Sequence, residues 1–175
     1  MRTLVPRSWG GTAAEMAAAY PCDGYLDVPY AKYVRAVDVE APVATTFRWL
    51  CQLKVAPYSY DWIDNGGRTS PRGKTGGVEE LAVGQPFLIF RIVDFAPGEH
   101  ISGLIRPELR RRYGPIATTY LTTPRTPTRT RLVVRLDVGA GSPWAWLRRE
   151  LLAAGDTVMM RKQLLTVKKL AERDA

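Results

Sequence analysis

The chain has 175 residues, 46% of them hydrophobic and 24% charged, which is the composition of an ordinary globular domain. A domain of this length buries roughly two thirds of the surface that its unfolded chain exposes, so it needs no metal or disulfide to stay folded. No uncharged stretch approaches the roughly 18 residues needed to cross a bilayer, and no apolar run of signal-peptide length follows Arg2. We therefore expect neither a membrane-spanning protein nor one exported by a signal peptide.

The two cysteines, Cys22 and Cys51, lie in unrelated local contexts and form no CxxC pair. This spacing indicates neither a zinc site nor a redox motif. We expect a cytoplasmic protein, because a reducing compartment is the simplest setting for these cysteines, and we expect no metal and no cofactor. The sequence also lacks GxSxG, HExxH, the phosphate-binding loop and the Rossmann glycine pattern.

The formal net charge of +8 raises the question of an anionic partner. Pro107 and Gly114 punctuate the strongest basic cluster, which favours a solvated loop over an anionic ligand site or a membrane-contacting surface. No RNP-like, zinc-finger or helix-turn-helix pattern accompanies the cluster, so nucleic-acid binding is the least favoured alternative. The cluster consists of Arg106, Arg110, Arg111 and Arg112.

No internal repeat or long linker divides the chain, so we treat residues 1–30 as an N-terminal extension and residues 31–175 as the main domain. In the extension, Thr12 and Glu15 have the spacing of a capping box. They predict a short helix over residues 13–20, ended by Pro21, that packs on the outside.

The main domain begins with a predicted strand over residues 32–39, rich in β-branched side chains and ended by Ala41-Pro42. Pro42 suits the first turn of a helix. Phe47, Leu50 and Leu53 follow at the spacing of one apolar face, and the helix ends before Pro57. A second short helical piece is predicted over residues 59–65.

After a glycine-rich crossing at residues 66–77, the apolar period becomes two. Strands are predicted over residues 86–95, 100–105, 116–123 and 129–138, the first two as a hairpin. The last strand has one apolar face and one largely polar face. The apolar face carries Leu132, Val134, Leu136 and Val138, and the other carries Arg131, Val133, Arg135 and Asp137.

Ser142 and Pro143 predict the start of a long helix that continues, with a weak point at Gly155-Asp156, to about Glu172. Roughly 30 residues at about 1.5 Å each give a rod about 45 Å long. Its apolar stripe needs a partner surface, and the sheet is the only adequate one. The stripe consists of Trp144, Leu147, Leu151, Ala154, Val158, Met160, Leu164, Val167 and Ala171.

This order of elements, with several short motifs, resembles the SRPBCC superfamily, the START-like group that includes polyketide cyclase/dehydrase-like proteins. The particular resemblance is to an uncharacterised bacterial branch and runs from Trp9 to nearly the end of the chain. The motifs that carry it are Trp9-Gly10, Ala41-Pro42, Trp49-Leu50, Tyr58-Ser59-Tyr60-Asp61-Trp62, Leu81-Ala82-Val83-Gly84, Thr130-Arg131-Leu132, Met159-Met160-Arg161-Lys162 and Ala171-Glu172.

The resemblance implies an α+β helix-grip fold, in which a curved antiparallel sheet wraps around the long C-terminal helix and two short helices follow the first strand. It further implies that residues 31–175 form a ligand-binding domain with a cavity for lipids, sterols or polyketides. It implies no shared catalytic residue, because members of the superfamily include carriers, receptors and cyclases.

Within that fold we expect the ligand to contact the dense group of aromatic residues between positions 49 and 62, the inner face of the strands and the long helix. Ordinary core packing is the alternative for each residue. The predicted ligand-binding residues are Trp49, Tyr58, Tyr60, Trp62, Phe90, Ile92, Tyr120, Val134, Leu151, Met160 and Leu164.

The candidates for acid–base chemistry are Tyr58, Tyr60, Asp61 and Asp64, because a carboxylate against aromatic rings can have a raised pKa. Helix capping or solvent exposure is the alternative for the two aspartates. We expect the single histidine, His100, to be solvated.

Strand alternation leaves two facings open for residues 87–95. Either Arg91 points inward with Phe87, or Leu88, Phe90 and Ile92 point inward together with Asp94, and we favour the second. On a later strand, Tyr120 with Thr118 and Thr122 gives a mildly polar inner wall or, alternatively, surface threonines.

The leading hypothesis is a non-catalytic protein that binds or carries a hydrophobic small molecule. The alternative is a cyclase or dehydratase that uses the tyrosines and aspartates above. Trp144 and Trp146 beside Arg148 and Arg149 suggest transient contact with an anionic membrane. The sequence leaves the ligand's identity and the oligomeric state open.

Overall fold

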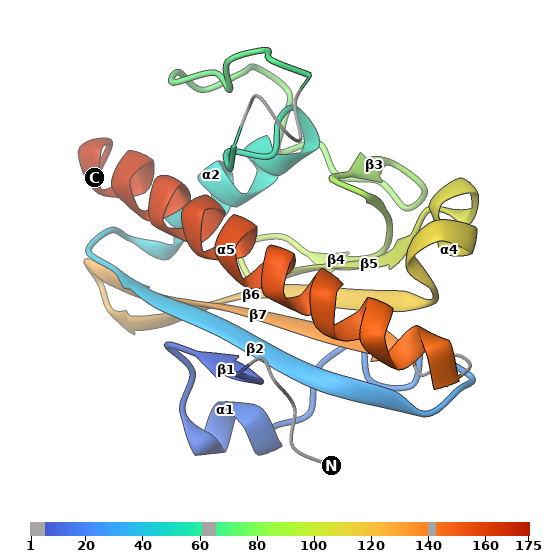
Figure 1. The fold of residues 1–175 in the computed structure, drawn as a ribbon. Coiled ribbons are helices and arrows are strands. Elements are labelled where there is room, and N and C mark those ends of the chain that lie inside the picture. The colour runs from blue at the N-terminus through green and yellow to red at the C-terminus, as the bar shows by residue number, and fades with distance from the viewer. Residues whose placement is uncertain (1–5, 61–65, 140–142) are drawn as a thin grey trace.

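A seven-stranded sheet lies at the centre of the molecule, with strand order β1-β2-β7-β6-β5-β4-β3. In this computed structural model the described residues are 6–60, 66–139 and 143–175, and of residues 143–157 only the helical backbone is described. Helices α2 and α5 cover one face of the sheet, and α1 lies against the other (Figure 1). The strands are β1 (Ser8–Trp9), β2 (Tyr30–Val39), β3 (Pro86–Phe87), β4 (Phe90–Ala96), β5 (His100–Ile105), β6 (Ile116–Thr126) and β7 (Arg129–Gly139), and the helices are α1 (Ala13–Ala17), α2 (Val43–Cys51), the short 3-10 helix η1 (Gln52–Lys54), α4 (Pro107–Tyr113) and α5 (Pro143–Arg173).

The predicted helix-grip architecture is confirmed, since the 31-residue helix α5 crosses one face of the sheet. The sheet is mixed and not purely antiparallel as predicted, because β1 pairs parallel with β2. Met160, Leu164 and Val167 of its predicted stripe are buried against the sheet and α2. The prediction was wrong for Val158, which is 55% exposed. Two residues correspond to about 200° around a helix, so Val158 and Met160 point in nearly opposite directions.

The sequence predicted the boundaries around α2 less well than its position. The helix ends at Cys51 instead of continuing toward Pro57, and η1 follows it directly. Pro42 is its N-cap residue. The second predicted helical piece lies mostly outside the described residues, and Ser59 and Tyr60 at its start are not helical.

The predicted strand over residues 86–95 is interrupted twice. Leu88 adopts a positive φ of 56° and, with Ile89, forms the turn between β3 and β4. A β-bulge between Ile92 and Asp94 then shifts the register against β5. The turn brings Phe87 opposite Phe90, so Phe87, Phe90 and Ile92 are all buried on the α5 side although Phe87 and Phe90 are three residues apart.

Arg91 is exposed, as predicted, but the prediction that Asp94 points inward was wrong because the bulge reverses its side. Asp94 Oδ2 lies 2.9 Å from His100 Nε2 instead. His100 was predicted to be solvated, yet its side chain is only 12% exposed because it packs beside this carboxylate.

The basic cluster was predicted as a loop, and this is wrong: Arg110, Arg111 and Arg112 lie in helix α4, and Arg106 is the N-cap residue directly before it. Pro107 occupies the first turn, where its missing N–H needs no partner, and Gly114 ends the helix with a φ of 81°. Arg110, Arg111 and Arg112 are exposed on it, so their predicted solvation is confirmed.

The second face of β7, predicted as polar, is not a solvent-facing surface. Arg135 and Asp137 are fully buried there, because the N-terminal segment crosses this side of the sheet. Tyr20 and Cys22 from that segment form a second hydrophobic cluster with Val133 and neighbouring strand residues. The N-terminal segment therefore closes the back of the sheet and leaves the α5 face for the cavity described below.

Helix α1 is anchored to β7 through its capping residue Glu15. The capping box is confirmed, although the helix ends at Ala17, three residues earlier than predicted. Both carboxylate oxygens of Glu15 accept hydrogen bonds from Arg131, at 2.8 and 2.9 Å. This pairing with Arg131 lowers the pKa of Glu15 from 4.5 to about 2.

We expect Glu15→Gln to lower the free energy of unfolding by about 2–3 kcal/mol at neutral pH. The folded-state pKa lies below the unfolded value of 4.5, so this stabilisation is fully present above that value. It is lost as the pH falls toward the folded-state pKa of about 2. Urea denaturation of both proteins at neutral pH and at about pH 3 measures the difference, with the exposed Glu99→Gln as control. A difference that does not shrink in acid contradicts this account.

Candidate functional site

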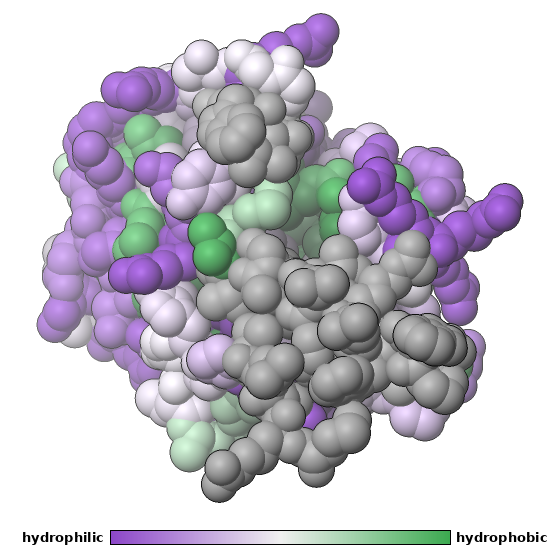
Figure 2. All heavy atoms as spheres, in the orientation of Figure 1, coloured by the Kyte–Doolittle hydropathy of each residue, from purple (hydrophilic) through white to green (hydrophobic). Residues whose placement is uncertain are grey.

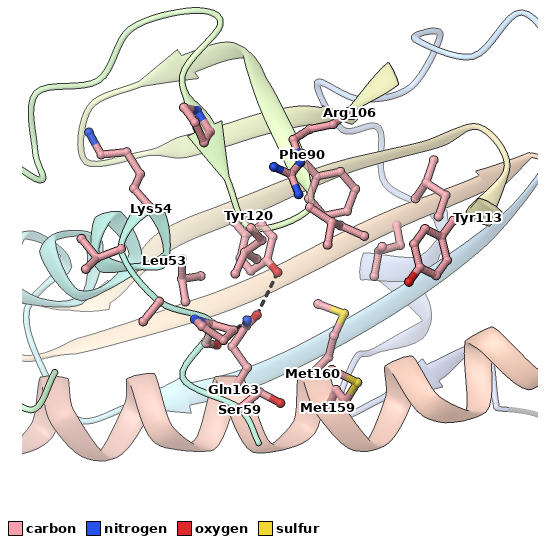
Figure 3. A pocket seen from close by; sticks show the side chains of 18 of the residues that line it. Leu53, Lys54, Ser59, Phe90, Arg106, Tyr113, Tyr120, Met159, Met160 and Gln163 are labelled. Carbon is pink, nitrogen blue, oxygen red and sulfur yellow. Dashed lines mark hydrogen bonds between the residues drawn. The ribbon is translucent and has the colours of Figure 1, made fainter. Parts of the chain in front are cut away.

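A cavity of about 440 Å³ lies between the inner face of the sheet, helix α5 and the loop that follows η1. Figure 2 shows this face hollowed, with hydrophobic residues in the hollow and hydrophilic side chains over α4 beside it. Figure 3 shows the side chains of most of the lining residues. The complete lining consists of Tyr33, Leu53, Lys54, Val55, Ala56, Pro57, Ser59, Pro86, Leu88, Ile89, Phe90, Arg106, Tyr113, Ile116, Tyr120, Leu136, Val138, Met159, Met160 and Gln163.

Strand alternation and helix periodicity together build the walls. Leu136 and Val138 come from the apolar face of β7, and Tyr120 lies beside that face on β6. Met159 and Met160 face the sheet from α5 (Figure 3). Methionine adapts to irregular apolar shapes, so this side of the cavity can adjust to a ligand.

Two linked hydrogen bonds cross the cavity wall, and they pair its polar side chains with protein groups. The Tyr120 hydroxyl donates to Gln163 Oε1 at 2.9 Å, and Gln163 Nε2 donates to the Pro57 carbonyl at 2.7 Å (Figure 3). The Phe87 ring packs edge-on against Tyr120, with centroids 5.2 Å apart. These contacts fix β6, α5 and the loop relative to one another and hold the Tyr120 ring in place.

Two lining side chains carry buried polar atoms without a hydrogen-bond partner among the described residues: Arg106 Nε and Ser59 Oγ. Glu108 Oε1 lies 3.7 Å from Arg106 Nε, which is too long for a hydrogen bond. In the view of Figure 3, Arg106 lies on the sheet side of the cavity and Ser59 lies near α5. Lys54 is different, because its Nζ donates to the Glu80 carbonyl at 2.7 Å.

The described lining contains no carboxylate, histidine or cysteine, so its only ionisable groups are lysine, arginine and tyrosine. Burial raises the pKa of both the Cys22 and the Cys51 thiols to about 12, so neither is a nucleophile at neutral pH. Within the same described ranges, no cluster of histidine, cysteine, aspartate or glutamate could hold a metal ion. No helix in that part of the chain is both long and apolar enough to cross a membrane.

Phe90, Tyr120 and Met160 line the cavity, and their role in ligand binding stays a prediction. Three other predicted residues, Ile92, Val134 and Leu164, belong to the surrounding core and do not line it. Asp61, Trp62 and Asp64 lie outside the described residues, as do the side chains of Leu151, Trp144, Trp146, Arg148 and Arg149.

The structure places the described part of the aromatic group away from the cavity. Trp49 is fully buried, and its Nε1 donates to Asp174 Oδ2 at 3.2 Å, near the C-terminus of α5. Tyr58 packs edge-on against Trp49, and its hydroxyl lies 3.4 Å from Gln52 Oε1. Tyr60 is half-buried and does not line the cavity. Thr118 and Thr122 are buried on the inner face, bonded to backbone carbonyls, so the surface alternative for them was wrong.

The sequence contained signals for some lining residues that were missed. Tyr33 alternates with Val37 and Val39, so it shares their face of β2. Gln163 lies three residues after Met160, within the buried stripe of α5, where a polar residue is unusual. No local pattern distinguishes Arg106 from the exposed arginines that follow it.

Several solved structures share this fold at low sequence identity. A protein from Mesorhizobium loti matches with a TM-score of 0.55 and 15% identity, over 83% of this chain and 99% of that chain. A protein from Thermobifida fusca matches with a TM-score of 0.53 and 13% identity, over 81% and 93% of the two chains. The di-domain ARO/CYC protein StfQ from the steffimycin biosynthetic pathway matches with a TM-score of 0.52 and 16% identity, over 83% of this chain and 51% of StfQ.

At these identities the likeness establishes the fold. The chain has the α+β helix-grip fold that its sequence motifs predicted, and it shares this fold with the Mesorhizobium loti protein and with StfQ. No protein-family model matches the sequence, and no curated protein does either.

Proposed function

We propose that this protein binds a hydrophobic small molecule in the cavity between the sheet and α5. The observation that carries the proposal is the cavity itself, which has mostly apolar walls and a volume of about 440 Å³. This volume falls within the roughly 300–1,000 Å³ typical of ligand pockets. Each buried methylene contributes about 0.8 kcal/mol, so about ten of them offset a large part of the cost of association.

Binding without catalysis is the better-supported activity. A cyclase or dehydratase needs a group that moves a proton, and the described lining offers no carboxylate or histidine for this. The aspartates that we considered for that role are Asp61 and Asp64, which lie outside the described residues. The likeness to StfQ keeps the enzyme as the second hypothesis.

A neutral hydrophobic probe tests the proposal directly. We expect N-phenyl-1-naphthylamine to bind the folded protein saturably at a single site, with increased fluorescence, and we expect dodecanol to displace it. Native mass spectrometry of protein purified from its own host should show a co-purified small-molecule mass. Absence of saturable binding by a folded protein that also carries no such mass would overturn the proposal.

A further inference from the structure

The cavity contains one cationic group whose buried donor is unused within the described chain. Arg106 lines the cavity directly after β5, and its Nε atom is buried without a hydrogen-bond acceptor. An unpaired buried donor is unfavourable, and guanidinium groups stay charged at all physiological pH values. In Figure 3 the side chain extends beside Phe90 on the cavity wall.

The neighbouring charges leave this guanidinium available. Glu108, at 3.7 Å, is the acid that the structure places near it, and its side chain is 55% exposed. An exposed ion pair of this kind is weak and is screened by salt. Lys54, the other cation in the lining, is held by the Glu80 carbonyl and by Gln85 Oε1. Arg106 is therefore the cation that a bound anion can reach.

We propose that the ligand is a hydrophobic carboxylate, with its carboxyl group bound by Arg106 and its apolar body against Phe90, Ile116 and Met160. This inference rests on the proposed function and adds the ligand's chemical class. A guanidinium matches a carboxylate in a planar, two-bond geometry, and the resulting charge-assisted bonds are stronger than neutral ones. A single guanidinium suits a single negative charge better than a phosphate dianion.

The surroundings favour an anion at the same place. Arg110, Arg111 and Arg112 are exposed on α4, which begins one residue after Arg106. The chain as a whole carries a formal net charge of +8, which raises the local concentration of anionic ligands. Ser59 Oγ, the other unpaired polar atom, offers one hydrogen bond to an oxygen elsewhere on the ligand.

Dodecanoate and dodecanol test this inference because they differ only at the head group. In competition with N-phenyl-1-naphthylamine, we expect the wild-type protein to bind dodecanoate about tenfold more tightly than dodecanol. Arg106→Gln should remove this preference, so that the variant binds dodecanoate no more tightly than dodecanol. Glu108→Gln should strengthen dodecanoate binding, because it removes the acid beside the guanidinium.

Arg111→Gln is the matched control, since Arg111 is exposed on the same helix and does not line the cavity. It should keep the preference. If Arg106→Gln does not fold, Arg106→Lys replaces it and should keep only part of the preference, because it loses the planar fork. Equal affinities for both ligands in the wild type would overturn the inference while leaving the proposed function intact. So would a full wild-type preference in the variant tested, whether Arg106→Gln or Arg106→Lys. Failure of the neutral probe and of both ligands to bind would overturn the proposed function as well.

Discussion

Replacing Arg135 by methionine is expected to lower the free energy of unfolding by about 3–5 kcal/mol, the loss typical of a broken buried ion pair. Arg135 Nε donates to Asp137 Oδ1 at 2.6 Å, and both side chains are fully buried. Arg135 also contacts Asp23 at 3.2 Å and lies over the Tyr20 ring at 5.2 Å. The substitution leaves Asp137 buried without this partner and loosens the N-terminal segment from the sheet.

Protonation limits the loss. Burial raises the pKa of Asp137, and Arg135 opposes that effect. Without Arg135, the carboxyl group takes up a proton more readily, so the loss of stability should lie near the lower end of the range and shrink as the pH falls. Urea denaturation at neutral and mildly acidic pH measures both effects.

Arg129 provides a matched control on the same strand. It pairs with Glu40 at 2.6 Å, but both side chains are about half exposed. Arg129→Met should therefore cost less than about 1 kcal/mol. The double substitution Arg135→Met with Asp137→Leu should recover much of the lost stability, because no charge is left buried. If Arg135→Met and Arg129→Met lower the free energy of unfolding equally, the buried ion pair between Arg135 and Asp137 does not stabilise the fold as expected.

The same strand shows how far local patterns predict this fold. Alternation along β7 predicted the strand and its apolar face, because both depend on neighbouring residues alone. The same alternation placed Arg135 and Asp137 on a polar face, but the structure buries both side chains. Their burial depends on Tyr20, Cys22 and Asp23, which lie more than a hundred residues earlier in the chain. No periodicity within the strand carries that information.

The cavity was predicted in the right layer of the molecule, but many of its lining residues were not. The aromatic density at Trp49 and Tyr58 suggested a ligand wall, whereas these side chains pack under the C-terminal end of α5. The turn that places Leu88 in the cavity lining could not be predicted, because a positive φ is unusual for a residue other than glycine or asparagine. The sequence indicates that apolar and aromatic residues are available to line a cavity, but tertiary packing decides which of them do so.

Replacing Met160 by tryptophan is expected to weaken binding of hydrophobic ligands about fiftyfold, the largest functional effect that we predict for a single substitution. Met160 is buried and projects from α5 into the cavity (Figure 3). An indole ring there would exclude part of the ligand's apolar body. Exclusion of about three methylenes, at about 0.8 kcal/mol each, corresponds to a loss of roughly 2.4 kcal/mol.

The probe titration described above measures this loss, and Val158→Trp is its control. Val158 lies on the same helix but is 55% exposed, so a tryptophan there adds the same ring outside the cavity and should leave binding unchanged. Thermal denaturation of both variants separates obstruction from unfolding, because overpacking alone can cost about 1–3 kcal/mol. If Met160→Trp unfolds, Ile116→Phe obstructs the cavity from the sheet side. A folded variant at position 160 or 116 that binds as tightly as the Val158 variant would show that the ligand does not occupy this cavity.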